Sequence, residues 1–196
     1  MGILPRDFFD RPTPDVARAL LGCKLVRQLN GSQMAGLVCE TEAYQGEADL
    51  GCHARAGKTE RTTVMYGAPG TLYIYFVYGM HWLMNIVTEP EGIPAAVLIR
   101  AIFPVEGLEM MAKYRPQQAY KDGWLDGPAK LTQALSLDGK MNGLDLCRQD
   151  SRLRVETGRS ISESKIQVGA RVGLNSVPEP WKSMPWRFMV DLYEVG

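Results

Sequence analysis

Residues 70–85 read GTLYIYFVYGMHWLMN, and this stretch decides the class of fold. Residues 71–77 and 82–88 are rich in β-branched and aromatic side chains, which favour strands, and a short segment with Gly79 separates them. Residues 95–102, AAVLIRAI, form a third run of the same kind. The pattern predicts a β-hairpin followed by a neighbouring strand.

The tyrosines of the hairpin do not all follow one register. Tyr73 and Tyr75 lie two positions apart and therefore share one face of the first strand. Tyr78 lies three positions beyond Tyr75, which breaks the period of two and moves it into the turn. We therefore expect Tyr78 at the tip of the hairpin.

A second hairpin is predicted upstream. Residues 23–29 and 34–44 are β-rich runs, and they flank Asn30-Gly31, the dipeptide most typical of a two-residue hairpin turn. Glu42 lies near the end of the second of these strands.

The remaining elements complete an α+β pattern. A helix is predicted over residues 14–21, with Thr13 as its N-cap, proline at its first position and Gly22 placed to end it. Further helices are expected over residues 104–114 and 128–135, and further strands over residues 153–156, 170–174 and 187–192. No linker interrupts residues 1–196, so we predict a single α+β domain with one curved, mixed, mainly antiparallel β-sheet flanked by helices.

Composition sets limits on function. The 196 residues include 22 basic and 22 acidic side chains, and a net charge of zero is unusual for a nucleic-acid-binding domain. Residues 53–66, HARAGKTERTTVMY, nevertheless carry Arg55, Lys58 and Arg61 against one acid, which leaves a local basic face. No apolar run is long enough to span a membrane, and the N-terminus does not resemble a signal peptide.

Cysteine and histidine usage argues against a metal site. The four cysteines form no C-x-x-C pair, and His53 and His81 are the only histidines. Cys52 lies beside His53, but adjacent residues of an extended chain point apart, so we interpret Cys52 as a packing residue. No metal or other cofactor is expected.

Five separated motifs carry a family resemblance. They are ETEAY at residues 40–44, His53, PGTLYIYFVYGMHWLMNI at 69–86, GPAKLTQAL at 127–135 and ARVGL at 170–174. In order and spacing they resemble the alkyladenine (3-methyladenine) DNA glycosylase family, the monofunctional type without a helix-hairpin-helix. The resemblance runs from residue 5 to the C-terminus.

The resemblance implies a function and a partner. It implies a DNA repair enzyme that flips alkylated or deaminated purines, such as 3-methyladenine, hypoxanthine or ethenoadenine, out of duplex DNA. The enzyme then hydrolyses the N-glycosidic bond and leaves an abasic site. The expected partner is damaged double-stranded DNA, with no membrane contact, and the expected state is a monomer in the cytoplasm or nucleoid, or in the nucleus of a eukaryote.

Glu42 and Arg100 are the candidate catalytic residues. By alternation with Thr41 and Ala43, Glu40 and Glu42 share one face of a strand, and on spacing alone a solvated surface is the ordinary interpretation. The resemblance assigns catalysis to the second glutamate of the motif. A carboxylate there can deprotonate water and stabilise the oxocarbenium character of the sugar. Arg100 is a strand-end charge by itself, and the resemblance places it beside the nucleotide phosphate and the catalytic water.

The resemblance also implies a base pocket. Tyr44, His53 and Tyr75 are its expected walls, since a flipped purine is held by stacking on aromatic faces, although each tyrosine alone would be ordinary core. The main chain of Gly51 lines the pocket, and the backbone amide of His53 bonds the purine 6-position. Asn85 is expected to exclude guanine by a clash with its 2-amino group.

Other residues are expected to contact DNA outside the pocket. Tyr78 is the implied intercalating side chain of a DNA-inserting hairpin, with Met80 beside it. Lys130 and Arg171 are expected to contact backbone phosphates or to support the site. Residues 57–68 match the family poorly, which leaves the preferred lesion open.

Two alternatives remain at this point. Alternating aromatics such as Tyr73 and Tyr75 also occur on single-stranded nucleic-acid modules without catalysis, although the glycine and aromatic arrangement typical of RNA-recognition domains is missing. A binding module would release no base. Lys130 as a Schiff-base nucleophile is the other alternative, and it would require a desolvated amine beside C1′.

Overall fold

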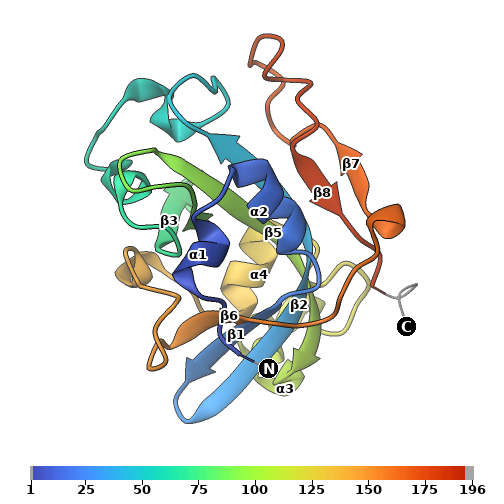
Figure 1. Cartoon of the computed structure of the whole chain (residues 1–196). Helices are drawn as coiled ribbons and strands as arrows, with labels where there is room; N and C mark the ends of the chain where they lie inside the picture. Colours follow the sequence, from blue (N-terminus) through green and yellow to red (C-terminus); the bar gives the residue numbers. More distant parts are fainter. Residues whose placement is uncertain (1, 193–196) are drawn as a thin grey trace.

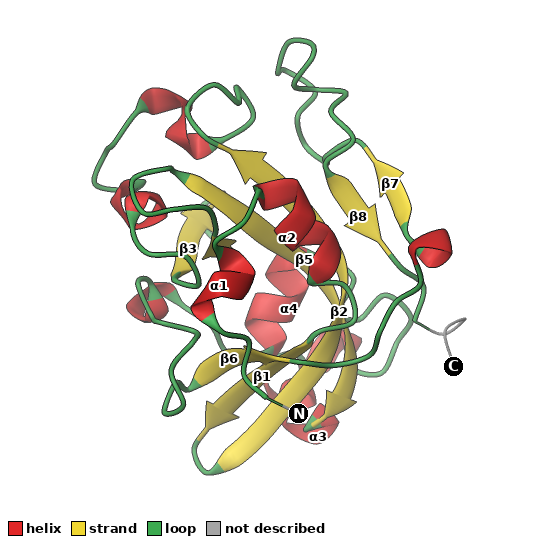
Figure 2. Ribbon diagram, viewed as in Figure 1, coloured by secondary structure: helices red, strands yellow, loops and turns green. Residues whose placement is uncertain are grey.

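The computed structural model describes residues 2–192 and places eight strands in one antiparallel sheet. The strands follow the order β3-β4-β5-β2-β1-β6, and β8 pairs with both β2 and β7. Figure 1 shows helices gathered around this strongly curved sheet, and Figure 2 shows the same arrangement by element type. The predicted α+β fold is confirmed, and every strand pairing within the described residues is antiparallel.

The strands are β1 Lys24–Leu29, β2 Ser32–Gln45, β3 Leu72–Val77, β4 His81–Val87, β5 Ala95–Glu106, β6 Leu153–Glu156, β7 Gln167–Gly169 and β8 Arg187–Met189. The α-helices are α1 Arg6–Phe9, α2 Thr13–Ala19, α3 Leu108–Tyr114 and α4 Pro128–Ala134. Short 3₁₀ turns are η1 His53–Ala56, η2 Thr63–Tyr66, η3 Pro116–Gln118, η4 Gly139–Met141 and η5 Glu163–Lys165.

Both predicted hairpins form. Asn30 and Gly31 have φ of 51° and 77°, the two positive values that a two-residue type I′ turn requires. In the β3–β4 hairpin, Val77 pairs with His81, and Tyr78 lies in the turn with φ of 53°.

A bulge shapes the pairing of β2 with β5. The register shifts on both sides of Glu40, so that Glu40 pairs with Ala101 while Thr41 pairs with Ile99. Arg100 therefore has no partner in the ladder. Bulges redirect side chains, and this one brings Arg100 against the carboxylates of β2.

Three sequence predictions of local structure are wrong. Thr13 is not an N-cap: it lies inside α2, and its hydroxyl donates to Glu89. Residues 104–106 continue β5 instead of starting a helix, because Pro104 falls where the register shifts between Ala35 and Gly36, a position that tolerates a missing N–H. Residues 170–174 form a turn rather than a strand, with Gly173 at φ of 82°.

Other boundaries differ less. The strand predicted over 187–192 ends at Met189, and α1 at Arg6–Phe9 was not predicted. Helix α3 begins after Gly107, whose φ is 73°, and a side chain there would meet the Gln33 carbonyl oxygen at 2.3 Å.

The packing divides into a large core and a small one. Helix α2 contacts β2 and β5, and α4 contacts β4 and β5, around the large core. The small cluster lies beside the 46–71 loop and includes Cys52, Met65 and Tyr73, with Tyr44 and Tyr75 packed against it. The packing therefore fixes the Tyr44 and Tyr75 side chains at the edge of the small cluster, where each remains partly exposed.

Candidate active site

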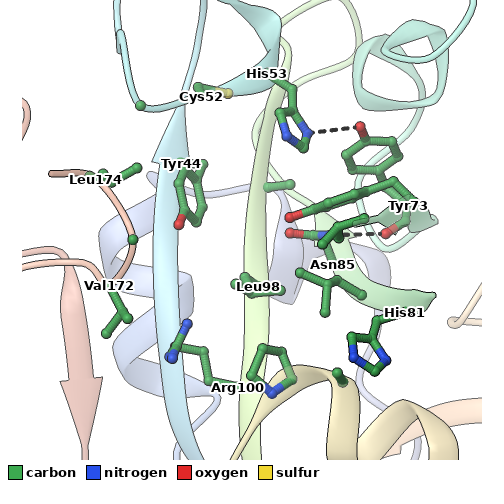
Figure 3. Close-up of a pocket in the computed structure, with 18 of the residues that line it drawn as sticks. Tyr44, Cys52, His53, Tyr73, His81, Asn85, Leu98, Arg100, Val172 and Leu174 are labelled. Atoms are coloured by element: carbon green, nitrogen blue, oxygen red, sulfur yellow. Dashed lines mark hydrogen bonds between the residues drawn. The ribbon is translucent and has the colours of Figure 1, made fainter. Parts of the chain in front are cut away.

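A cavity of about 440 Å³ lies over the small cluster. Its size is within the range of small-molecule sites. Figure 3 shows Tyr44 on one side of it, Tyr73 and Asn85 on the other, and His53 and Arg100 at opposite ends. The structure thus brings together most of the predicted site residues, and those that line this cavity are Tyr44, Gly51, His53, Tyr75, Tyr78, Asn85 and Arg100.

Glu42 lies behind the wall of the cavity. Its side chain is fully buried, and its three polar neighbours Tyr44, Arg100 and Val172 all line the cavity. The Val172 amide donates to Oε1 at 2.6 Å, and the Tyr44 hydroxyl donates to Oε2 at 2.8 Å. The interpretation of this face as solvated is therefore wrong, because the turn at 170–174 covers it.

Burial controls the protonation of Glu42. Burial raises the pKa of the Glu42 carboxyl, and the charge of Arg100 and the bonds from Val172 and Tyr44 lower it, with a net increase. Burial and the neighbouring Glu42 raise the pKa of the Tyr44 phenol well above its usual value, so Tyr44 remains a donor. A carboxylate in this setting is suited to accept a proton.

Arg100 bridges the two glutamates of ETEAY. Its Nε donates to Glu40 at 2.7 Å, and its Nη1 lies 3.4 Å from Glu42. Glu40 also accepts from Arg187 at 2.6 Å, and its side chain is only 12% exposed. Glu40 therefore holds Arg100 in place, a role that differs from the solvated surface position suggested by its spacing.

His53 is part of an aromatic cluster at the other end of the cavity. Its Nδ1 lies 3.1 Å from the Tyr73 hydroxyl, and its ring meets the Tyr75 ring edge to face at 4.4 Å. Burial, with Arg61 and Arg55 nearby, lowers the pKa of His53 to about 4, so the ring is neutral at pH 7.

Asn85 is fixed against the same cluster. Its amide nitrogen donates to the Tyr73 carbonyl oxygen at 3.2 Å, and the residue is buried. Asn85 therefore has the hydrogen-bond partner that a buried polar side chain in a strand requires.

Tyr78 and Met80 project from the hairpin tip. Tyr78 is 88% exposed and Met80 67% exposed, the two largest fractions among the exposed large hydrophobic side chains of the described residues. Met80 does not line the main cavity but a neighbouring groove beside α4.

The two predicted backbone-contacting cations occupy different settings. Lys130 lies near the surface, where its Nζ donates to Asp126 at 2.5 Å and to the Gly123 carbonyl oxygen. Arg171 is buried in an ion pair with Asp49. The Arg171 side chain has no exposed surface, whereas Lys130 is partly exposed.

Sequence reasoning missed several residues at the site. Asp49 lies in a segment without periodicity, and only the folded chain brings it to Arg171. Val172 lies within the ARVGL motif, but nothing in the sequence indicated that its amide reaches Glu42. Tyr73 was placed on the right strand face without a role. Arg61, whose guanidinium lies 5.0 Å from the Tyr75 ring centroid, could have been suspected from the basic stretch.

Within residues 2–192, no cluster of three or more histidine, cysteine, aspartate or glutamate side chains is arranged to hold a metal ion. None of the helices in this range has the length and apolar character needed to cross a membrane.

The sequence matches known proteins over nearly its whole length. Residues 7–193 match the family described as methylpurine-DNA glycosylase (MPG). A relative from Methanocella arvoryzae is 47% identical over 188 residues, which cover 96% of this chain and 92% of the relative. One from Carboxydothermus hydrogenoformans is 44% identical over 186 residues, 95% of this chain and 94% of the relative. Both carry the name "Putative 3-methyladenine DNA glycosylase".

These matches define a class of enzyme, the DNA glycosylases, which are hydrolases of DNA repair. The chain belongs to the methylpurine-DNA glycosylase family. The resemblance inferred from the five motifs is confirmed, and the alternative of a non-catalytic nucleic-acid module is set aside, because the matched family consists of glycosylases.

Proposed function

We propose that this enzyme extrudes alkylated or deaminated purines from duplex DNA, stacks them in the tyrosine-lined cavity and hydrolyses their N-glycosidic bond. 3-Methyladenine, hypoxanthine and ethenoadenine are the proposed substrates. The observation that carries the proposal is the juxtaposition of an aromatic cavity, a buried carboxylate behind its wall and an exposed aromatic at its rim.

In this proposal Glu42 activates water. The water oxygen attacks C1′, its proton passes to Glu42, and the base departs with the electron pair of the glycosidic bond, leaving an abasic site. The contact of Glu42 with Arg100 at 3.4 Å is the longest of its three polar contacts, so water enters most easily there. Arg100 lines the cavity and provides positive charge for the nucleotide phosphate.

The aromatic walls provide affinity without strict selection. Stacking on tyrosine is worth about 1 to 3 kcal/mol per base and tolerates different purines. Selection is assigned to the His53 backbone amide, which favours bases that accept at the purine 6-position. Asn85 excludes guanine, because its bond to Tyr73 prevents it from turning away from a 2-amino group.

Extrusion is assigned to the hairpin tip. Tyr78 fills the gap left by the flipped nucleotide, and Met80 supports the wedge from the groove side. Lys130 contacts a backbone phosphate in this scheme. The enzyme acts as a monomer, in the cytoplasm or nucleoid or in a eukaryotic nucleus.

An excision panel tests the proposal. Purified enzyme is incubated in excess with duplexes that contain 3-methyladenine, hypoxanthine, ethenoadenine or undamaged adenine, and the released base is quantified. Release of damaged bases over adenine is expected. Cationic 3-methyladenine should leave fastest, because it needs no leaving-group acid, whereas neutral hypoxanthine gains from one. Equal release of adenine would contradict the assignment of selectivity.

A further inference from the structure

The buried ion pair of Arg171 and Asp49 lies next to the site. Arg171 and Asp49 have no exposed side-chain surface, and they bond bidentately, Nη1 to Oδ2 at 2.5 Å and Nη2 to Oδ1 at 2.8 Å. Pairs of this kind are costly to desolvate, and well-packed apolar residues commonly serve stability as well or better. We therefore expect the ion pair to contribute less to stability than to the geometry of the chain segments that it joins.

The pair ties four chain segments together. Asp49 accepts the backbone amides of Gln45 at 3.2 Å and Gly51 at 2.9 Å. Arg171 donates to the carbonyl oxygens of Ala43 at 3.0 Å and Trp181 at 3.1 Å. The end of β2, the loop before His53, the turn at 170–174 and the loop before β8 are thus joined at one point.

This junction reaches Glu42 by two routes. The Arg171 guanidinium lies 4.7 Å from the centroid of the Tyr44 ring, and Tyr44 donates to Glu42 Oε2. Val172 follows Arg171 in the chain, and its amide donates to Glu42 Oε1 at 2.6 Å. Two of the three polar contacts of the carboxylate, one on each oxygen, therefore depend on where Arg171 is held.

We propose that Asp49 and Arg171 act as a positioning pair, which holds the Tyr44 phenol and the Val172 amide on the two oxygens of Glu42 and so fixes the orientation of this carboxylate for water activation. The inference rests on the proposed role of Glu42. Neither member of the pair touches the substrate in this scheme.

Displacement of the Tyr44 phenol and the Val172 amide should change the pH dependence of excision in a specific way. The groups that face Glu42 are Arg100, Glu40, Tyr44 and the Val172 amide, and the last two lower the pKa of its carboxyl. If they shift, the pKa of Glu42 increases, and the acid limb of the pH profile for single-turnover excision moves to higher pH. Simple loss of folded protein would reduce the amplitude of the profile and leave its limb in place.

The test uses Arg171→Lys, which keeps the charge but loses the bidentate fork and the planar stack on Tyr44. We expect excision of hypoxanthine to decrease by about 10- to 100-fold, the cost of a displacement of about 1 Å, with lesion-DNA binding retained and the acid limb shifted upward. Arg154→Lys is the matched control, because Arg154 pairs with Glu156 at 2.7 Å on β6, outside the cavity. It should leave rate and pH profile unchanged.

A second variant keeps the inference testable if Arg171→Lys does not fold. Asp49→Asn with Arg171→Met removes both charges, while the asparagine amide oxygen can still accept a backbone amide, and this variant should fold yet show the same slow excision and shifted limb. A folded variant with wild-type rate and limb would overturn the inference, and so would a slower rate with an unmoved limb.

Glu42→Gln is measured in parallel to separate the two hypotheses. Full activity of Glu42→Gln would refute the proposed role of Glu42. An inactive Glu42→Gln together with a wild-type Arg171→Lys would refute only the positioning pair.

Discussion

Replacing Tyr78 by alanine tests whether the hairpin tip is a wedge. A tyrosine buries about 150 to 250 Å² when inserted, and Tyr78 is 88% exposed in the free enzyme, so nearly all of that area is available. At about 25 cal/mol per Å² the gain is about 4 kcal/mol. We expect Tyr78→Ala to lose about 2 to 3 kcal/mol of it, which is about 30- to 150-fold in the extrusion equilibrium.

The assay is single-turnover excision of hypoxanthine in a paired duplex, in a mismatch and in a single strand. The decrease should be greatest for the paired lesion, because the wedge offsets unstacking that the other substrates have partly undergone. Tyr75→Ala should slow excision in all three contexts, since a pocket wall is needed however the base arrives.

Two control variants isolate the wedge. Tyr78→Phe keeps the ring and should remain close to wild type. Tyr120→Ala removes a tyrosine that is 61% exposed and also has positive φ, at 63°, but lines a different cavity, so excision should not change. If Tyr78→Ala and Tyr75→Ala gave the same profile across the three substrates, the wedge assignment would be refuted.

Further predictions concern protonation, metal and salt. The folded-state pKa of His53 is about 4, below its usual 6.5, so the unfolded chain binds more protons between these values and stability should decrease as the pH falls from 6.5 to 4. His53→Gln should flatten this dependence by about 1 to 2 kcal/mol in denaturant unfolding at pH 5, and an equally steep dependence would contradict the assignment. Exhaustive dialysis against EDTA should leave excision unchanged, because the sequence has two histidines and no C-x-x-C pair; activity that vanished and returned with zinc would refute this. Lys130→Ala should weaken DNA binding for all sequences and reduce the salt slope by about one, whereas an unchanged slope would mean that Lys130 stays with Asp126.

The parts of the fold that sequence predicts well are those set by neighbouring residues. Asn30-Gly31 specifies its hairpin because both residues adopt positive φ readily, and the break in register at Tyr78 specifies the tip. Pro104 was assigned to a helix because proline commonly begins one. Pro104 is admitted into β5 at a register shift opposite Ala35 and Gly36 of β2, and the local sequence around Pro104 does not reveal that pairing.

The candidate site also has features that the sequence indicates and features that only the folded chain shows. The family resemblance implies Tyr44, His53, Tyr75 and Asn85 as pocket residues, and all four line the cavity. The burial of Glu42 was not predictable, because the turn that covers it comes from 130 residues further along the chain. The pairing of Asp49 with Arg171 spans 122 residues and leaves no local pattern.

The central claim is that this chain hydrolyses the N-glycosidic bond of damaged purines in DNA, with Glu42 as the general base. Single-turnover excision of one hypoxanthine duplex by wild type and by Glu42→Gln tests this claim most directly. Wild type should release free hypoxanthine and leave an abasic strand. Glu42→Gln should be slower by about 10² to 10⁴ while binding the same duplex as tightly. Release of base by Glu42→Gln at the wild-type rate would contradict the account.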